Sequence, residues 1–209
     1  MDVGELLINN PKGNERATVV LAHGAGAPMD HPSLTAVAEA LAESGLRVVR
    51  FEFPYMRRRR THGVRRGPDP PAVLLETWRA VIEKLGGGAG LVIGGKSMGG
   101  RMASMVADEA GTRALVCLGY PFHPPGKPAQ LRIAHLAGLR TPALIVQGER
   151  DPFGSREEVE GYQLSQAIRI EWIPDADHSL KSLKKSGRTE KQNLAQAVSA
   201  LTAFVLGLP

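Results

Sequence analysis

The sequence predicts an α/β protein: a three-layer αβα sandwich built around a mostly parallel sheet of about six or seven strands. Three observations predict it. Short apolar runs rich in β-branched residues recur along the chain, segments with helical spacing lie between them, and glycine or proline separates one from the next. Alternation of this kind indicates βαβ units. We expect all 209 residues to form one domain, because no internal repeat or linker divides the chain.

The predicted strands are the apolar runs. The first, ATVVLA at residues 17–22, has no charged residue, which is typical of a strand buried on both faces. The later runs read RVVRFEF, LVIG, ALVCLG, PALIVQ and IRIEWI. They occupy residues 47–53, 91–94, 114–119, 142–147 and 168–173.

The predicted helices lie between and after these strands. Ser33 can cap the first of them, and Gly45 ends it. Pro71 suits the first position of the second helix. The proline-rich stretch within residues 120–140 is expected to be irregular, because proline lacks an amide donor, and it is too short for a lid domain. The helices are expected at residues 33–44, 71–85, 98–111, 155–164 and 189–206.

Composition indicates an ordinary soluble protein, with 43% apolar and 22% charged residues. The single cysteine, Cys117, excludes an internal disulfide framework and is typical of a protein from a reducing compartment. Its apolar surroundings predict that it is a small buried hydrophobic residue. The first residues lack the pattern of a signal peptide, and no apolar run approaches the ~20 residues of a membrane span. We therefore expect a cytoplasmic protein without a membrane segment.

The positive charge is concentrated in one segment, RRRRTHGVRR at residues 57–66. Without its six arginines the net charge of +5 would become −1, so nucleic-acid binding is not expected. We expect this segment to form a loop at the carboxyl end of the preceding strand, where ligands bind in open α/β sheets. Three interpretations stay open: a solvated flexible loop, a site for an anionic substrate, and a surface for an acidic partner. The arginines concerned are Arg57, Arg58, Arg59 and Arg60.

The stretch LVIGGKSMGG at residues 91–100 fits two motifs. Read from Gly90, it matches the phosphate-binding loop G-x-x-x-x-G-K-S, with Lys96 and Ser97 as nucleotide contacts. Read from Gly95, it matches G-x-S-x-G, the turn that presents a nucleophilic serine. A phosphate-binding loop needs its strand to end before the first glycine, whereas here LVI is itself the strand. The serine turn fits, because a strand precedes it, a helix follows it, and Gly95 and Gly99 leave room around it.

A nucleophilic serine requires a base and an acid that orients the base. In the fold that carries this turn, the acid and then the histidine follow on loops after later strands. The strand PALIVQ leads to Asp151, and the strand IRIEWI leads to His178. We therefore expect Ser97, Asp151 and His178 to form a catalytic triad. Other acids near these loops compete for the orienting role, namely Glu149, Asp175 and Asp177.

The same chemistry requires main-chain amides that bind an oxyanion. The amide of Met98, at the start of a helix, is one candidate, and the amide of Ala25 in the loop HGAGA is the other. His23, Gly24 and Gly26 are expected to shape that loop, His23 through hydrogen bonds rather than proton transfer. The sequence GAGAPM lacks the third glycine of a dinucleotide-binding motif. The remaining histidines show no metal-ligand spacing, so no metal or organic cofactor is implied.

Several segments together resemble the alpha/beta-hydrolase superfamily, and within it the small lidless hydrolases related to dienelactone hydrolases. They are LAHGAGAPMDHP, RFEFPY, GGKSMGGRMAS, LGYPFHPPGKP, QGERDPFG and DADHSLK, spread over residues 22–181. A closer likeness is to the testis-expressed hydrolase-like proteins and to the hydrolase-like domain of a chromatin acetyltransferase-complex subunit. The resemblance implies the same triad and a shortened N-terminal strand near residues 5–8. Dienelactone hydrolases themselves carry cysteine where Ser97 stands.

Two functions from different classes remain at this stage. The first is a serine hydrolase that cleaves small carboxylic esters, thioesters or lactones in an open site through an acyl-enzyme. The second is a scaffold with little or no catalytic activity that binds an acidic partner through its arginine-rich segment. An apparently complete triad favours the first, because a scaffold has no physical need of it.

Overall fold

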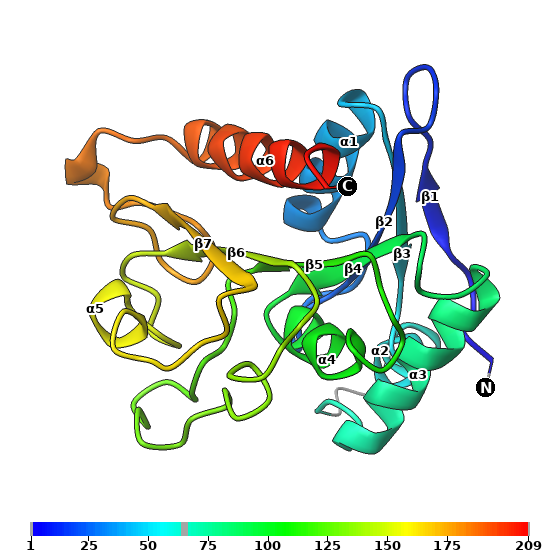
Figure 1. Ribbon diagram of the computed structural model, residues 1–209, viewed down its shortest axis with the longest axis horizontal. Coiled ribbons are helices and arrows are strands. Elements are labelled where there is room, and N and C mark those ends of the chain that lie inside the picture. Colours follow the sequence, from blue (N-terminus) through cyan, green and yellow to red (C-terminus); the bar gives the residue numbers. More distant parts are fainter. Residues whose placement is uncertain (1, 64–66, 209) are drawn as a thin grey trace.

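The computed structural model describes residues 2–63 and 67–208 and contains a central seven-stranded sheet (Figure 1). The strand order is β1-β3-β2-β4-β5-β6-β7. All neighbouring strands are parallel except β1, which runs antiparallel to β3 at one edge. The predicted fold class is therefore confirmed. The strands are β1 Leu7–Asn9, β2 Ala17–Ala22, β3 Leu46–Phe51, β4 Leu91–Lys96, β5 Ala114–Leu118, β6 Ala143–Gly148 and β7 Ile168–Ile173.

Helices cover both faces of the sheet. Helices α1 and α6 contact each other on one face, and α3 and α4 pack together on the other (Figure 1). Alternate residues of β2 enter the two cores: Val19 and Leu21 pack on the α1 and α6 side, and Val20 on the α3 and α4 side. The helices are α1 Pro32–Glu43, α2 Pro54–His62, α3 Pro71–Lys84, α4 Met98–Val106, α5 Arg156–Val159 and α6 Glu190–Leu206, with a 3₁₀ turn at Lys184–Ser186.

The arginine-rich segment differs from its prediction, because α2 is a helix where a loop is expected. Pro54 occupies its first turn, and Gly63, with a left-handed φ of 67°, ends it. Only Tyr55 and Met56 of this helix are buried. A helix with so few apolar positions leaves no periodic pattern in the sequence, which is why the prediction was wrong.

Other helices differ from their predictions at their ends. Helix α1 begins at Pro32 with His31 as its N-cap, where Ser33 was expected in that role. Helix α4 ends at Val106, short of the predicted residue 111. Helix α5 comprises only four residues after a capping box, because the chain turns away before Gly161. Within residues 2–63 and 67–208, no helix is long and apolar enough to cross a membrane.

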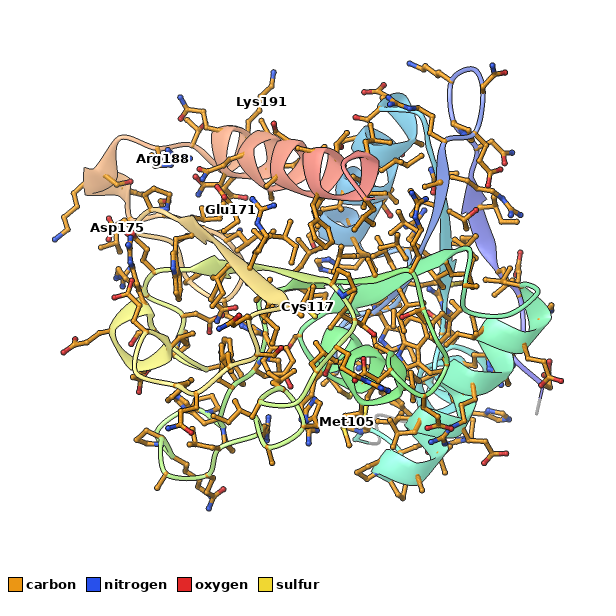
Figure 2. The ribbon with its side chains drawn as sticks, viewed as in Figure 1. Met105, Cys117, Glu171, Asp175, Arg188 and Lys191 are labelled. Atoms are coloured by element: carbon orange, nitrogen blue, oxygen red, sulfur yellow. The ribbon has the colours of Figure 1, made fainter. Side chains whose placement is uncertain are left out.

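The parallel direction of the strands determines where functional side chains can meet. The segments that follow β2, β4, β6 and β7 all leave the sheet at its carboxyl edge. Cys117 lies within β5 near the centre of the molecule and is buried, as its apolar surroundings predicted (Figure 2). The sheet thus holds four loops together at the carboxyl ends of its strands.

Candidate active site

Ser97 occupies a sharp turn between β4 and α4. Its backbone has φ of 51° and ψ of −117°, a combination that costs free energy for a residue with a side chain and is typical of functional turns. The turn packs tightly against β2: a Cβ on Gly95 would overlap the carbonyl of Ala22, and one on Gly99 would lie 2.5 Å from the carbonyl oxygen of His23. Glycine is therefore required at both positions that the sequence singled out.

A chain of hydrogen bonds joins three loops at this turn. The Oγ of Ser97 lies 2.8 Å from Nε2 of His178, and Nδ1 of His178 lies 2.7 Å from Oδ2 of Asp151. An ionised carboxylate only accepts hydrogen bonds, so Nδ1 carries the proton and Nε2 is free to accept the serine hydroxyl. Ser97, Asp151 and His178, which the sequence places on separate loops, are brought together here.

Asp151 is fully buried, and two further donors hold its carboxylate. The main-chain amide of Phe153 donates to Oδ1 at 2.8 Å, and the side-chain amide of Gln147 donates to Oδ2 at 3.0 Å. The carbonyl oxygen of Gln147 accepts the amide of Tyr120 at 2.7 Å, which fixes the orientation of Gln147. Gln147 was missed in the sequence. The sequence feature that could have identified Gln147 is a polar residue at the end of the otherwise apolar strand PALIVQ, four positions before Asp151.

The other three acids that competed for the orienting role have different partners. Glu149 accepts Arg156 at 2.9 Å, and Asp175 lies 3.8 Å from Nε of Arg150. Asp177 accepts main-chain amides of its own turn. Among the described residues, the carboxylate that contacts the imidazole is therefore that of Asp151.

His178 is also held by contacts that do not use its ring nitrogens. The ring of Phe153 packs on the imidazole with 4.2 Å between centroids. The ammonium group of Lys96 donates to the main-chain carbonyl of His178. Burial lowers the pKa of Lys96 to about 8, against the opposing effect of the Asp151 and Asp177 carboxylates. The residue before Ser97 thus supports the histidine loop.

The loop after β2 is fixed by His23 and Tyr55. The Nδ1 of His23 lies 2.6 Å from the carbonyl of Gly24, and its Nε2 accepts the amide of Phe53 at 3.1 Å. Burial lowers the pKa of His23, which favours the neutral ring that this pattern needs. The hydroxyl of Tyr55 donates to the carbonyls of Gly24 at 3.3 Å and Ala25 at 3.0 Å. Tyr55, which lies on α2, was missed in the sequence.

The main-chain amides of Met98 and Ala25, near Ser97, have no hydrogen-bond partner among the described residues. The first lies at the start of α4. The second follows Gly24, where a Cβ would come within 3.7 Å of the Cβ of Ser97, so this loop borders the serine. Gly26 has open space around it within the described residues, and nothing in the structure explains glycine there.

The expected loop conformation at Arg57 to Arg60 is wrong, because these residues lie in α2, and three of them form ion pairs; anion binding by them stays a prediction. Arg59 is half-buried and pairs with no acid among the residues that the structure describes. Arg65 and Arg66 lie outside the described residues. The pairs are Arg57 with Asp2 at 3.0 Å, Arg58 with Asp69, and Arg60 with both Glu52 at 2.8 Å and Asp30.

Comparison with known proteins identifies similar domains. A family model described as an alpha/beta hydrolase domain matches residues 15–206. A dienelactone hydrolase from Anabaena variabilis aligns with a TM-score of 0.73 and 22% identity over 99% of this chain and 94% of that one. An a/b serine hydrolase without lid from Xanthomonas campestris aligns with a TM-score of 0.72 and 21% identity, over 98% of this chain and 89% of that one. A serine hydrolase homologue from Coxiella burnetii aligns with a TM-score of 0.71 and 23% identity, over 94% of this chain and 89% of that one. At these identities the structural likeness shows the fold.

Proposed function

The chain belongs to the alpha/beta hydrolase family, and from this premise we propose that it hydrolyses carboxylic esters through an acyl-enzyme on Ser97. The observation that carries the proposal is the continuous chain of hydrogen bonds from Ser97 through His178 to Asp151, at 2.8 and 2.7 Å. A serine hydroxyl becomes an effective nucleophile when a positioned base accepts its proton, and this geometry supplies that base.

In the proposed reaction, Oγ of Ser97 attacks the ester carbonyl while Nε2 of His178 accepts its proton. The negative charge that develops on the carbonyl oxygen is bound by the free amides of Met98 and Ala25. His178 then returns the proton to the leaving alcohol as the carbon–oxygen bond breaks, which leaves the acyl group on Ser97. Water then attacks the acyl-enzyme while His178 accepts one of its protons. His178 returns that proton to Oγ of Ser97 as the bond between the acyl carbon and Oγ breaks, which releases the carboxylic acid and restores Ser97.

The proposed substrates are small esters, with thioesters and lactones as the other acyl compounds that this mechanism can cleave. The loop with Ala25 and Gly26 is exposed, and the segment after β5 forms neither helix nor strand over the site. A site with little to enclose a substrate suits short acyl groups. The alternative, a scaffold that binds acidic partners through the arginine-rich segment, has less support, because three of its arginines already pair with acids of the same chain.

A fluorophosphonate probe tests the proposal directly. We expect the native protein to form one covalent adduct, which mass spectrometry locates on the peptide that contains Ser97. Heat-denatured protein is the control and should not react, because an isolated serine lacks its base. An unreactive native protein, or an adduct on another residue, would contradict an activated Ser97. A matched panel of acetyl ester, acetyl thioester and small lactone then identifies the preferred substrate class.

Replacement of Tyr55 by phenylalanine should lower kcat about fivefold and change KM little. The variant loses the hydroxyl that holds the carbonyls of Gly24 and Ala25, so the Ala25 amide is less well fixed, and one such hydrogen bond contributes ~1 kcal/mol. Tyr162→Phe is a matched control, because its half-buried ring lies away from that loop. Equal kcat values for the two variants would show that Tyr55 does not position the amide.

A further inference from the structure

A cavity lies beside the candidate active site, on the face of the sheet that α1 and α6 cover. It has a volume of about 620 Å³, which falls within the range of small-molecule sites. Its inner end reaches the carboxyl ends of β4 and β5, and the segment after His178 forms one side. Ser97, Asp151 and His178 do not line it. The aliphatic part of the lining includes Pro32, Leu34, Val37, Leu118, Leu180 and Leu194.

Of the three lysines that line the cavity, Lys96 is half-buried, and Lys181 and Lys191 are exposed. Within residues 2–63 and 67–208, no carboxylate forms an ion pair with the ammonium group of Lys96, which donates only to the carbonyl of His178. The other two lysines that line the cavity have different surroundings from Lys96. Lys181 pairs with Glu190 at 3.1 Å at the rim, and Lys191 projects outward from the start of α6 (Figure 2). Burial of an ammonium group that has no ion-pair partner is unfavourable; the charges of Asp151 and Asp177 offset part of this cost, and an anion supplied by a ligand would relieve more of it.

We propose that this cavity binds an aliphatic monocarboxylate, with its carboxylate on Lys96 and its hydrocarbon chain between α1 and α6. Lys96 is the half-buried lysine of this lining, and its single charge calls for one negative group. The walls favour an aliphatic chain, because the described lining residues contain no phenylalanine, tyrosine or tryptophan on which an aromatic ring could stack. Lys96 also donates to the main-chain carbonyl of His178. A carboxylate bound to Lys96 would therefore contact the same ammonium group that holds the histidine loop.

Calorimetric titration with sodium decanoate tests the site. We expect saturable binding of one decanoate per chain, and at least about tenfold weaker binding of 1-decanol, which lacks the charge. The titration is repeated after Ser97 has reacted with a small phosphonate, or in Ser97→Ala if no adduct forms. Binding in the cavity should persist in either protein. Loss of binding after modification of Ser97 would place decanoate in the catalytic site and overturn the proposal, whether or not the protein hydrolyses esters.

Two substitutions locate the ligand. Lys96→Met keeps the length of the side chain but removes the charge, and should weaken decanoate binding about tenfold. Ala36→Trp fills the cavity from the half-buried side of α1 and should abolish binding of decanoate and decanol alike. Lys191→Met is the matched control, with affinity expected within about twofold of the native protein because this amine projects into solvent. Unchanged affinity in Ala36→Trp would overturn the site, and equal affinity of decanol and decanoate in the native protein would overturn the role of Lys96.

The affinity for decanoate should also fall as the pH rises through and above 8. Burial lowers the pKa of Lys96 to about 8, so its charge is present below that pH and lost above it, while the ligand stays ionised. A bound carboxylate favours the ammonium form and moves the fall to somewhat higher pH. Decanol binding, and decanoate binding to Lys96→Met, should show no such fall, which separates Lys96 from its titratable neighbours. These neighbours are Asp151, Asp177, His178, His31, Lys181, Glu190 and Lys191.

Discussion

Ser97→Ala should lower kcat for ester hydrolysis by about 10⁴- to 10⁶-fold while the protein stays folded. The substitution removes the attacking oxygen and nothing else, because the hydrogen-bond partner of Oγ is Nε2 of His178 and the main-chain amide keeps its bond to the carbonyl of Leu118. Alanine meets the left-handed φ of 51° under the same steric restrictions as serine. The measurements are kcat with a p-nitrophenyl acetate substrate and the thermal midpoint of unfolding.

The control for Ser97→Ala is Ser104→Ala in α4, the helix that follows Ser97. The hydroxyl of Ser104 is also hydrogen-bonded, to the carbonyl of Arg101 at 2.7 Å and to His135 at 2.8 Å, but it does not contact His178. We expect a small loss of stability and nearly native kcat. If Ser97→Ala lost less than about tenfold in kcat, the acyl-enzyme mechanism would be wrong.

The triad could be predicted from the sequence because each of its members follows a strand. Parallel strands have their carboxyl ends on the same side of the sheet, so the loops with Ser97, Asp151 and His178 had to lie near one another, and chain order predicted the roles proposed for them. The residues that hold the triad could not be predicted in the same way. Gln147 acts through the direction of one side-chain amide, and Tyr55 reaches Ala25 across 30 positions in the sequence. Such contacts depend on side-chain rotamers, which spacing does not encode.

The arginine-rich segment shows a second limit of sequence reasoning. Six arginines with no acid between them predicted a loop, and a solvated flexible loop was one of three open interpretations, because like charges repel. The acids that pair with them come from elsewhere: Asp2 from the N-terminal segment, Asp30 and Glu52 from loops after strands, and Asp69 from the approach to α3. Tertiary contacts bring acids that are distant in the sequence next to these arginines. The local composition therefore predicted more unpaired positive charge in α2 than the structure contains.

Asp151→Asn should lower kcat about 10⁴-fold, nearly as much as the loss of the nucleophile. The carboxylate accepts three donors: Nδ1 of His178, the side-chain amide of Gln147 and the main-chain amide of Phe153. An asparagine at this position replaces one acceptor oxygen by an NH₂ group. If that group takes the place of Oδ2, it faces the donor of Gln147 and moves the His178 proton to Nε2, which can then no longer accept a proton from Ser97.

The opposite orientation of the introduced asparagine is also unfavourable, since its NH₂ group would then face the amide of Phe153, and full burial leaves no water to compensate. Gln147→Met is the matched comparison, because it removes one donor to Asp151 but leaves the carboxylate and the His178 tautomer unchanged. We expect it to lower kcat only about tenfold. Similar losses for Asp151→Asn and Gln147→Met would mean that packing around Asp151, rather than its charge and its acceptor atoms, sets the rate. A much larger loss for Asp151→Asn would assign the rate to the tautomer that this carboxylate imposes.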